Sequence, residues 1–315
     1  MRSLGAWIPA VLFFSVLGCA DAPSGVEAEI DALFGAPAYG SVNRTEARRM
    51  LEVTPEDDRP FYAVTFARHR ARAAYPDGRP TDLTGADADA LYGDLVRPIL
   101  ADVGAEAIFL GDVERTLIAG DGAGWDRVSV VLYPSRAAFL AMLKRSDHRA
   151  AAVHEAAALE RAIALVTEPA ANQVPEDLRR LDLSALPFPP TASDSPVNVV
   201  HLIRFNEIAR YADGRATDLT GREALALYEQ HRTPQAFPLG VRPGIVLEVE
   251  GELIGDGRAW DEVRLNNFPS HAAFAELVRA ESLIEAGYED REAALADTYA
   301  LLVAPALNRV GYLPP

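Results

Sequence analysis

The sequence is poor in the residues on which several kinds of chemistry depend. It has 315 residues but one cysteine, Cys19, and only six histidines. A single cysteine excludes a disulfide framework within the chain. The sequence also lacks a Gly-rich phosphate loop at a strand–helix junction and a Gly-x-Ser-x-Gly elbow, so nucleotide binding and acyl transfer have no support. His148 and His154 are six residues apart, which is not the i, i+4 spacing of a metal pair on a helix, and no metal site is expected.

Basic residues are scarce as well. The sequence has 30 Lys and Arg but 46 Asp and Glu, which gives a net charge of −16. A chain this acidic repels phosphate backbones and anionic headgroups. We therefore expect no nucleic-acid partner. Hydrophobic residues make up 49% and charged residues 24%, an ordinary globular balance in a chain long enough for about two domains.

Long apolar runs are also missing, apart from residues 6–17 behind Arg2, a run too short for a typical membrane span. The run ends in Val-Leu-Gly-Cys at Cys19, which resembles the bacterial lipoprotein signal (lipobox). The resemblance implies a signal peptide at 1–19, a lipid on Cys19 as the only contact with a membrane, and an outer-membrane location facing the periplasm, because Ala20 rather than Asp follows. Ordinary cleavage after Ala20 is the alternative and gives a soluble periplasmic protein.

The strongest positive signal is an eleven-residue stretch that occurs twice, which we call the signature loop. It reads Tyr-Pro-Asp-Gly-Arg-Pro-Thr-Asp-Leu-Thr-Gly at 75–85 and Tyr-Ala-Asp-Gly-Arg-Ala-Thr-Asp-Leu-Thr-Gly at 211–221, with nine of eleven positions identical. A Trp-Asp pair recurs at 125 and 260, and Pro-Ser-x-Ala-Ala-Phe recurs at 134 and 269. The chain is therefore a tandem duplication with an offset of 136 or 135 residues.

Each copy has the same order of predicted elements. Alternating apolar residues predict strands, and Thr followed three residues later by Asp or Glu predicts a capped helix start after each signature loop. In the first copy the expected strands are 61–68, 105–118, 127–133 and 162–167, with helices from 85, from 135 and over 149–159. In the second copy they are strands 197–205, 245–250, 262–268 and 299–303, with helices from 222 and from 270. Pro98 and Pro234 are expected to end or kink the first helix of each copy.

The predicted fold class is α+β, with two tandem ferredoxin-like (βαββαβ) domains. Their sheets are expected to face each other and close a barrel, so that one chain forms an intramolecular pseudo-dimer. The expected segments are the signal peptide 1–19, an N-terminal tether 20–59 without chemistry, domain one at 60–169, a Pro-rich linker 170–196 and domain two at 197–311.

The signature loop, the Gly-Asp-Gly-x-x-Trp-Asp turn and the Pro-Ser-x-x-Ala-Phe helix start resemble the domain of unknown function 1330 family, which belongs to the dimeric α+β barrel superfamily. The resemblance implies similarity in fold to cofactor-independent monooxygenases, muconolactone-isomerase-like proteins and haem-binding chlorite-dismutase-like proteins. It covers 60–169 and 197–309 and implies no activity. Related sequences have a pattern similar to His-Arg-x-Ala-Ala-Leu just before the last strand. Here the first copy keeps only the His, at His154, and the second keeps only the Arg, at Arg291.

Candidate site residues come from the signature loop, the strand ends, the Trp-Asp pairs and this split pattern. An Arg fork beside Tyr could bind a carboxylate or enolate, Trp could floor an apolar pocket, and His154 could act as a general base or axial haem ligand. The structural interpretation of the same residues is a turn, an ion pair, a helix cap and a core anchor. The candidates for catalysis are His154, Arg68, Tyr75, Arg204, Tyr211 and Arg291, and those for ligand binding are Arg79, Arg215, Trp125 and Trp260.

These features lead us to expect a protein that binds a small apolar or carboxylated molecule, or a protein partner, without a cofactor. The alternative is a cofactor-independent monooxygenase or isomerase that works inside the barrel, and a haem-binding protein is a more distant one. Any chemistry is best sought where the two copies differ. These positions are His154 against Asp290 and Glu155 against Arg291.

Overall fold

The structure is a computed structural model that describes residues 25–119, 124–171, 175–282 and 287–315. The predicted signal peptide, Cys19 and the first Gly-Asp-Gly turn lie outside the described residues. The helices are α1 (Val26–Phe34), α2 (Arg44–Glu52), α3 (Gly85–Asp102), α4 (Arg136–Lys144), α5 (Ser146–Ala158), α6 (Gly221–Ala236), α7 (His271–Ser282) and α8 (Tyr288–Ala294). The strands are β1 (Ser41–Val42), β2 (Phe61–His69), β3 (Glu106–Ile118), β4 (Arg127–Tyr133), β5 (Leu159–Pro169), β6 (Val197–Phe205), β7 (Arg242–Gly255), β8 (Glu262–Phe268) and β9 (Leu295–Asn308).

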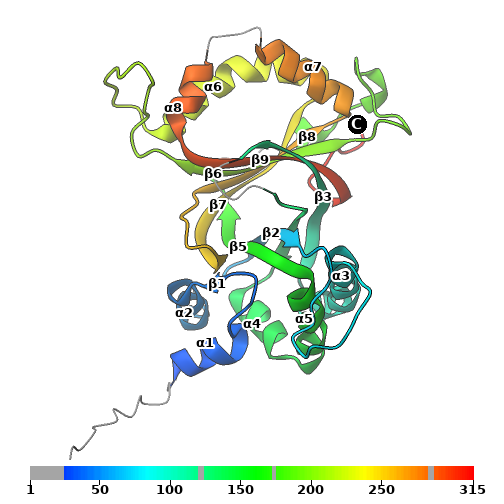
Figure 1. The fold of residues 1–315 in the computed structure, drawn as a ribbon. Helices are drawn as coiled ribbons and strands as arrows, with labels where there is room; N and C mark the ends of the chain where they lie inside the picture. Colours follow the sequence, from blue (N-terminus) through cyan, green and yellow to red (C-terminus); the bar gives the residue numbers. More distant parts are fainter. Residues whose placement is uncertain (1–24, 120–123, 172–174, 283–286) are drawn as a thin grey trace, which may run out of the picture.

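Eight of these strands form a closed antiparallel barrel (Figure 1). Neighbouring strands follow the order β7-β5-β2-β4-β3-β9-β6-β8, and a further pairing of β8 with β7 closes the ring. The two-residue strand β1 adds to β7. The closed barrel expected from two facing sheets is therefore present.

The two halves of the barrel have the same internal strand order. In the first half the neighbouring strands are β5, β2, β4 and β3, which are the fourth, first, third and second strands of that copy along the chain. In the second half the neighbours β9, β6, β8 and β7 follow the same order. Two seams join the halves, one between β5 and β7 and one between β3 and β9. Helices α1 to α5 cover the barrel on one side and α6 to α8 on the opposite side (Figure 1).

The barrel interior is filled by apolar side chains from all eight strands. Its fully buried members include Val64, Leu165, Val200, Leu265 and Leu301. These residues alternate along each strand with residues that face the helices, as the period of two in the sequence predicts. The barrel is thus a packed core rather than a channel.

Each signature loop fixes the start of the helix that follows it. Thr84 caps α3 and Thr220 caps α6, each in a capping box with Asp87 or Glu223. A Cβ at Gly85 would lie 2.4 Å from the carbonyl oxygen of Arg70. Only glycine fits such an approach, which explains why the loop ends in Gly in both copies.

Residues 26–52, expected as part of a tether, are folded onto the barrel. Ile30 on α1 and Met50 on α2 are fully buried in one apolar cluster with Phe61 and Leu253. The sequence pattern is weak here because the apolar partners lie on strands of both copies, far away in the sequence. The N-terminal segment therefore adds a layer to the first half and contacts β7 of the second.

Helices α3 and α6 do not end at their prolines. The helix α3 continues from Pro98 to Asp102, and α6 continues from Pro234 to Ala236. Each proline lies near the C-terminal end of its helix, where it removes one backbone hydrogen bond and the remaining residues still complete the last turn. Of the two expected outcomes, an end of the helix at the proline was wrong, and a kink there stays a prediction.

Candidate functional site

Both tryptophans of the repeated Trp-Asp pair lie at one end of the barrel. All neighbouring strands are antiparallel, and β2 and β6 are four steps apart around the ring, so these two strands run in the same direction. Their C-terminal ends, near Arg68 and Arg204, therefore share one end of the barrel. We call it the tryptophan end.

An aromatic cluster forms the floor of the tryptophan end. The ring centroids of Trp125 and Tyr299 are 5.8 Å apart, those of Trp260 and Tyr299 are 5.4 Å apart, and Phe66 lies 6.1 Å from Trp125. Trp125 is 3% and Trp260 5% exposed, and their indole N–H groups have no hydrogen-bond acceptor among the described residues. The cluster is an apolar surface that carries two buried donors.

The aspartates of the Trp-Asp pairs have a structural role. The carboxylate of Asp126 accepts a hydrogen bond from the backbone N–H of His69 at 2.7 Å, and that of Asp261 accepts one from Phe205 at 2.6 Å. Each therefore ties the end of a barrel strand to the turn that carries the tryptophan. This geometry agrees with an anchor and a turn cap rather than a general base.

The two halves differ in what covers the aromatic floor. In the second half, Arg258 stacks on Trp260 with its guanidinium 5.0 Å from the ring centroid and donates a hydrogen bond to the hydroxyl of Tyr299 at 2.5 Å. The first-half counterpart of Tyr299 is the much smaller Ile163. In the first half, Arg161 stacks on Trp125 at 4.5 Å. The side chain that fills the second half is therefore missing from the first.

A pocket of about 510 Å³ opens at this place. Its walls come from the segment before β1, from the start of β5 and from the ends of β2 and β7. The lining residues are Ala38, Tyr39, Gly40, Ser41, Arg68, Glu160, Arg161, Ala162, Ile163, Gly255 and Asp256. The lining thus combines two arginines and two carboxylates with an apolar set of alanine, isoleucine and tyrosine.

The charges at the pocket rim are partly balanced. Arg68 pairs with Glu160 at 3.3 Å, and both side chains are about half exposed, at 41% and 53%. Such an exposed pair is weak and can exchange one carboxylate for another. Asp256 on the opposite rim pairs with Arg258, whose guanidinium holds the pKa of that carboxyl below its usual range against the effect of burial.

Behind the pocket wall lies a carboxyl group with an unusual pKa. The hydroxyl of Tyr39 donates a hydrogen bond to Glu155 at 3.1 Å, and the backbone oxygen of Tyr39 accepts one from Ala162 at 2.8 Å. Burial and the negative charge of Asp89 together raise the pKa of Glu155 to about 7, against the hydrogen bond from Tyr39, which lowers it. Tyr39 therefore connects the pocket to a group that titrates near neutral pH.

The sequence did not identify Tyr39 or Arg161 as site residues, and it pointed to Glu155 only as a place where the two copies differ. Tyr39 lies in the interval expected as a tether, and the surroundings of Glu155 include Tyr39 and Asp89, which no local pattern reports. For Arg161 there was a signal, since the second copy has Asp297 at the matching position. Such a reversal of charge at one position of a duplicated strand is a sign of divergence.

The predicted residues of the signature loops come together, but away from this pocket. In the first half the hydroxyl of Tyr75 lies 2.7 Å from Nδ1 of His154, and Arg79 stacks on the Tyr75 ring at 3.7 Å. Burial lowers the pKa of His154, and the charge of Arg79 lowers it further. A neutral His154 can accept the tyrosine proton in a hydrogen bond.

The second signature loop repeats this arrangement with different chemistry. Tyr211 donates to Oδ1 of Asp290 at 2.6 Å, and Arg215 stacks on the Tyr211 ring at 3.6 Å. Asp290 is the counterpart of His154, so both residues accept a hydrogen bond from the loop tyrosine. The arrangement explains how each loop is held on its helix, and catalysis by these residues stays a prediction.

The remaining candidates, Arg204 and Arg291, lie in different surroundings. Arg204 is exposed at the end of β6, paired in register with Asp297. Arg291 on α8 faces the layer between helices and sheet, where burial lowers the pKa of His201 to about 3 and the charge of Arg291 contributes. The two are therefore not part of the tryptophan-end pocket.

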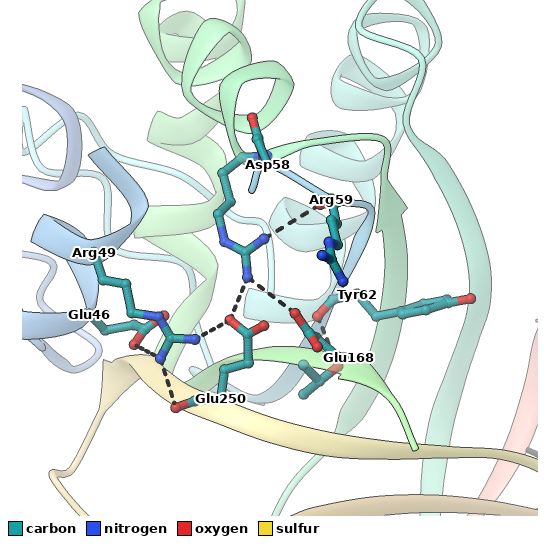
Figure 2. Close-up of polar contacts among 9 residues, drawn as sticks. Glu46, Arg49, Asp58, Arg59, Tyr62, Glu168 and Glu250 are labelled. Carbon is teal, nitrogen blue, oxygen red and sulfur yellow. Dashed lines mark hydrogen bonds and ion pairs between the residues drawn. The ribbon is translucent and has the colours of Figure 1, made fainter. Parts of the chain in front are cut away.

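A second polar cluster lies at the seam between β5 and β7 (Figure 2). Glu250 of β7 accepts hydrogen bonds from Arg136 at 2.5 Å and from Arg49 at 2.6 Å. Its carboxylate is therefore paired with one arginine from α4 and one from α2. Glu168 also lies near Arg136, at 3.8 Å, and its hydrogen bond with Glu250 raises its pKa. The cluster joins the N-terminal segment and both halves, and we interpret it as a structural lock.

The part of the chain that the structure describes offers few ligands for a metal or a haem. Within them, no group of three or more His, Cys, Asp or Glu is arranged to hold a metal ion. The lining of the tryptophan-end pocket includes no histidine, so this pocket does not fit a haem with an axial histidine. Among the described helices, none is long and apolar enough to cross a membrane.

Comparison with known proteins gives similarity without an activity. No family model matches the chain, and none of the curated proteins matches it. The RPA0582 protein of unknown function from Rhodopseudomonas palustris is 31% identical, with 42% of this chain and 96% of that chain covered and a TM-score of 0.36. Its methylated form gives 35% identity over 38% and 95%, with a TM-score of 0.34.

A double mutant of chlorite dismutase from Candidatus Nitrospira defluvii is 14% identical over 78% of this chain and 92% of that chain, with a TM-score of 0.41. The chain is thus similar, over about two fifths of its length, to nearly the whole of a protein of unknown function.

Proposed function

We propose that the protein binds a small carboxylate with an apolar body in the tryptophan-end pocket. The observation that carries the proposal is the pocket of about 510 Å³ with Arg68 and Arg161 above a wall that includes Ile163. Guanidinium groups match carboxylates in geometry and charge, and an apolar wall suits the rest of such a molecule. In a chain of net charge −16, Arg68 and Arg161 balance the two carboxylates of the lining, Glu160 and Asp256, so this pocket is less acidic than the chain as a whole.

A binding role fits the packing better than an enzyme that works inside the barrel. The interior contains nineteen buried side chains, including Val64, Leu202 and Leu301, which leave the space inside to the core itself. Any ligand therefore meets the rim of the barrel, where the pocket is open to solvent. The candidates His154 and Tyr75 are held against each other on the helix side.

Isothermal titration calorimetry with benzoate, and with benzyl alcohol as its uncharged analogue, tests the proposal. We expect benzoate to bind and benzyl alcohol to bind at least about tenfold more weakly, because only the carboxylate pairs with the arginines. Arg68→Met should weaken benzoate binding by about tenfold or more. Arg204→Met, at the matching position of the second half, is the control and should leave the affinity unchanged.

Glu160→Gln gives a change in the opposite direction. Glu160 is the carboxylate that competes with the ligand for Arg68, so its removal should raise the affinity for benzoate by a few fold. Absence of binding for benzoate and for longer carboxylates, with a folded protein, would contradict the proposal. Recovery of a protein partner in its place would favour the protein-binding alternative.

We further propose that the barrel arose as two tandem ferredoxin-like domains of the domain of unknown function 1330 family, and that the protein is exported and anchored through Cys19. The repeated strand order and the offset of 136 residues support the duplication. The Val-Leu-Gly-Cys ending of the apolar run supports the anchor. Mass spectrometry of the mature N-terminus from bacterial cells tests the anchor, and an unmodified chain starting after Ala20 would point to the soluble periplasmic form.

A further inference from the structure

The pocket wall and a partly buried acid, Glu155, meet at one residue, Tyr39. Tyr39 lines the pocket, and its hydroxyl donates a hydrogen bond to Glu155 at 3.1 Å. Its backbone oxygen accepts a hydrogen bond from the backbone N–H of Ala162, another lining residue, at 2.8 Å. Tyr39 therefore cannot move without affecting both the pocket and the surroundings of Glu155.

Glu155 is also connected to the pocket through the backbone. It lies in the last turn of α5, and β5 begins with no intervening loop at Leu159. The next residues along β5, Glu160 and Arg161, line the pocket. The carboxyl group and the anion-binding arginines are thus held on one continuous segment.

The surroundings of Glu155 contain more negative than positive charge. Asp89 of α3 faces it, and the nearby tyrosines on the other packed elements are Tyr39, Tyr92 of α3 and Tyr133 of β4. The guanidinium of Arg127 is bound to Asp89 at 2.6 Å, and Nε2 of His69 lies 3.0 Å from the same carboxylate. When Glu155 ionises, its charge therefore has no cation of its own among these groups.

From this geometry we infer that Glu155, acting through Tyr39, couples the binding of a carboxylate in the tryptophan-end pocket to proton uptake. A bound anion and an ionised Glu155 repel each other across Tyr39, so the pocket binds anions more tightly when Glu155 is neutral. By linkage, the ligand also raises the tendency of Glu155 to keep its proton. Glu155 is a positioning residue here, and the inference rests on the proposed function.

The size of the effect follows from the distance. For a bound carboxylate about 10 Å from Glu155, an effective dielectric constant of about 25 to 50, between the value at a protein surface and that of water, gives a change in affinity of about three- to tenfold. Benzoate itself stays ionised between pH 5.5 and 8.5, roughly, because model carboxyl groups titrate near pH 4. A change in benzoate affinity over this pH range therefore results from ionisation of the protein and not of the ligand.

The test is calorimetry of benzoate binding from about pH 5.5 to 8.5, around the neutral region where a raised carboxyl titrates, in buffers of different ionisation enthalpy, which counts the protons taken up. Wild-type protein should bind about three- to tenfold more weakly at the high end and take up a fraction of a proton near pH 7. Glu155→Gln keeps the acceptor for Tyr39 and should bind benzoate with no proton uptake. His69→Gln, which removes the other ionisable partner of Asp89, is the control and should retain the uptake.

The outcomes separate this inference from the proposed function. Benzoate binding without proton uptake, or uptake that survives Glu155→Gln, overturns the inference and leaves the proposed function intact. Failure of all carboxylates to bind at any pH overturns the proposed function and the coupling with it. A merely structural role for Glu155 would change stability and affinity at every pH, but would not remove proton uptake alone.

Discussion

The two halves of the tryptophan end share a backbone and differ in a few side chains. Where the second half has Tyr299 and Asp297, the first has Ile163 and Arg161. Arg258 is held over the floor by an ion pair with Asp297 at 3.1 Å and by a hydrogen bond to Tyr299. Beside Ile163 and Arg161 of the first half lies the pocket, which Gly255 and Asp256 of the second half also line. After a duplication, one copy can fill its site and add stability while the other keeps an opening.

The two seams show the same divergence. At the N-terminus of α4, Arg136 reaches across the β5–β7 seam to Glu250, and Asp58 caps the helix. At the matching start of α7, His271 lies 2.7 Å from Glu114 across the β3–β9 seam, and its backbone N–H donates to Asp194. One lock is a buried arginine that is always charged, and the other is a half-exposed histidine that titrates.

The largest effect should come from breaking the buried lock. Arg136→Met leaves Glu250 and Glu168 facing each other without their shared cation, and should lower the free energy of unfolding by about 3 to 5 kcal/mol. Urea unfolding followed by circular dichroism measures it. A loss below about 1 kcal/mol would show that Arg49 alone can hold the seam together.

Exchange of the half-specific residues at the tryptophan end should have the next largest effect. Tyr299→Ile removes a fully buried ring and the hydrogen bond from Arg258, at a cost of about 2 to 4 kcal/mol in stability. The reverse change, Ile163→Tyr, should fill the pocket and abolish benzoate binding while the protein stays folded. If Ile163→Tyr binds benzoate like the wild type, the ligand does not enter this half.

Stability should also depend on the protonation of Glu155. Its pKa is raised in the folded state to about 7 from an ordinary value of 4.5, so the folded protein binds the proton more tightly. Stability from this group is then present at low pH and falls as the pH rises from 4.5 to about 7. Glu155→Gln should remove this dependence and stabilise the protein by about 1 to 3 kcal/mol at high pH, as thermal unfolding at several pH values can show.

The smallest effect is expected at the histidine lock. The hydrogen bond to Glu114 raises the pKa of His271 above its ordinary value of 6.5, and Asp194 adds to the shift. The stabilisation is therefore complete below pH 6.5 and is lost as the pH rises through the folded-state pKa. Because both side chains are about 40% exposed, the loss should stay below about 1 kcal/mol. His271→Arg should abolish this pH dependence, and a dependence that persists would assign it elsewhere.

Much of the fold could be predicted from the sequence because its determinants are local and repeated. The bounds of β4, β6 and β8 match the predicted strands, and the capping boxes begin α3 and α6 as expected. The closed barrel followed from two sheets that each needed a cover. These features depend on periodicity and capping, which neighbouring residues determine.

The candidate site could be predicted only in part, because its walls are assembled from distant segments. Trp125 and Arg68 were among the predicted residues, since duplication made the first visible and strand ends are accessible. Tyr39 was missed because its partners, Ala162 and Glu155, lie more than a hundred residues away. The signature loop was the best-matched stretch between the copies, yet its tyrosines hold a loop on a helix in both halves.

The central claim is that the first half of the tryptophan end binds a carboxylate and the second half does not. A crystal structure with 4-bromobenzoate tests it most directly, because the anomalous signal of bromine locates the ligand. The account predicts one bromine site in the pocket beside Ile163, with the carboxylate on Arg68. Bromine at the matching position over Tyr299, or only at places outside the tryptophan end, would contradict it.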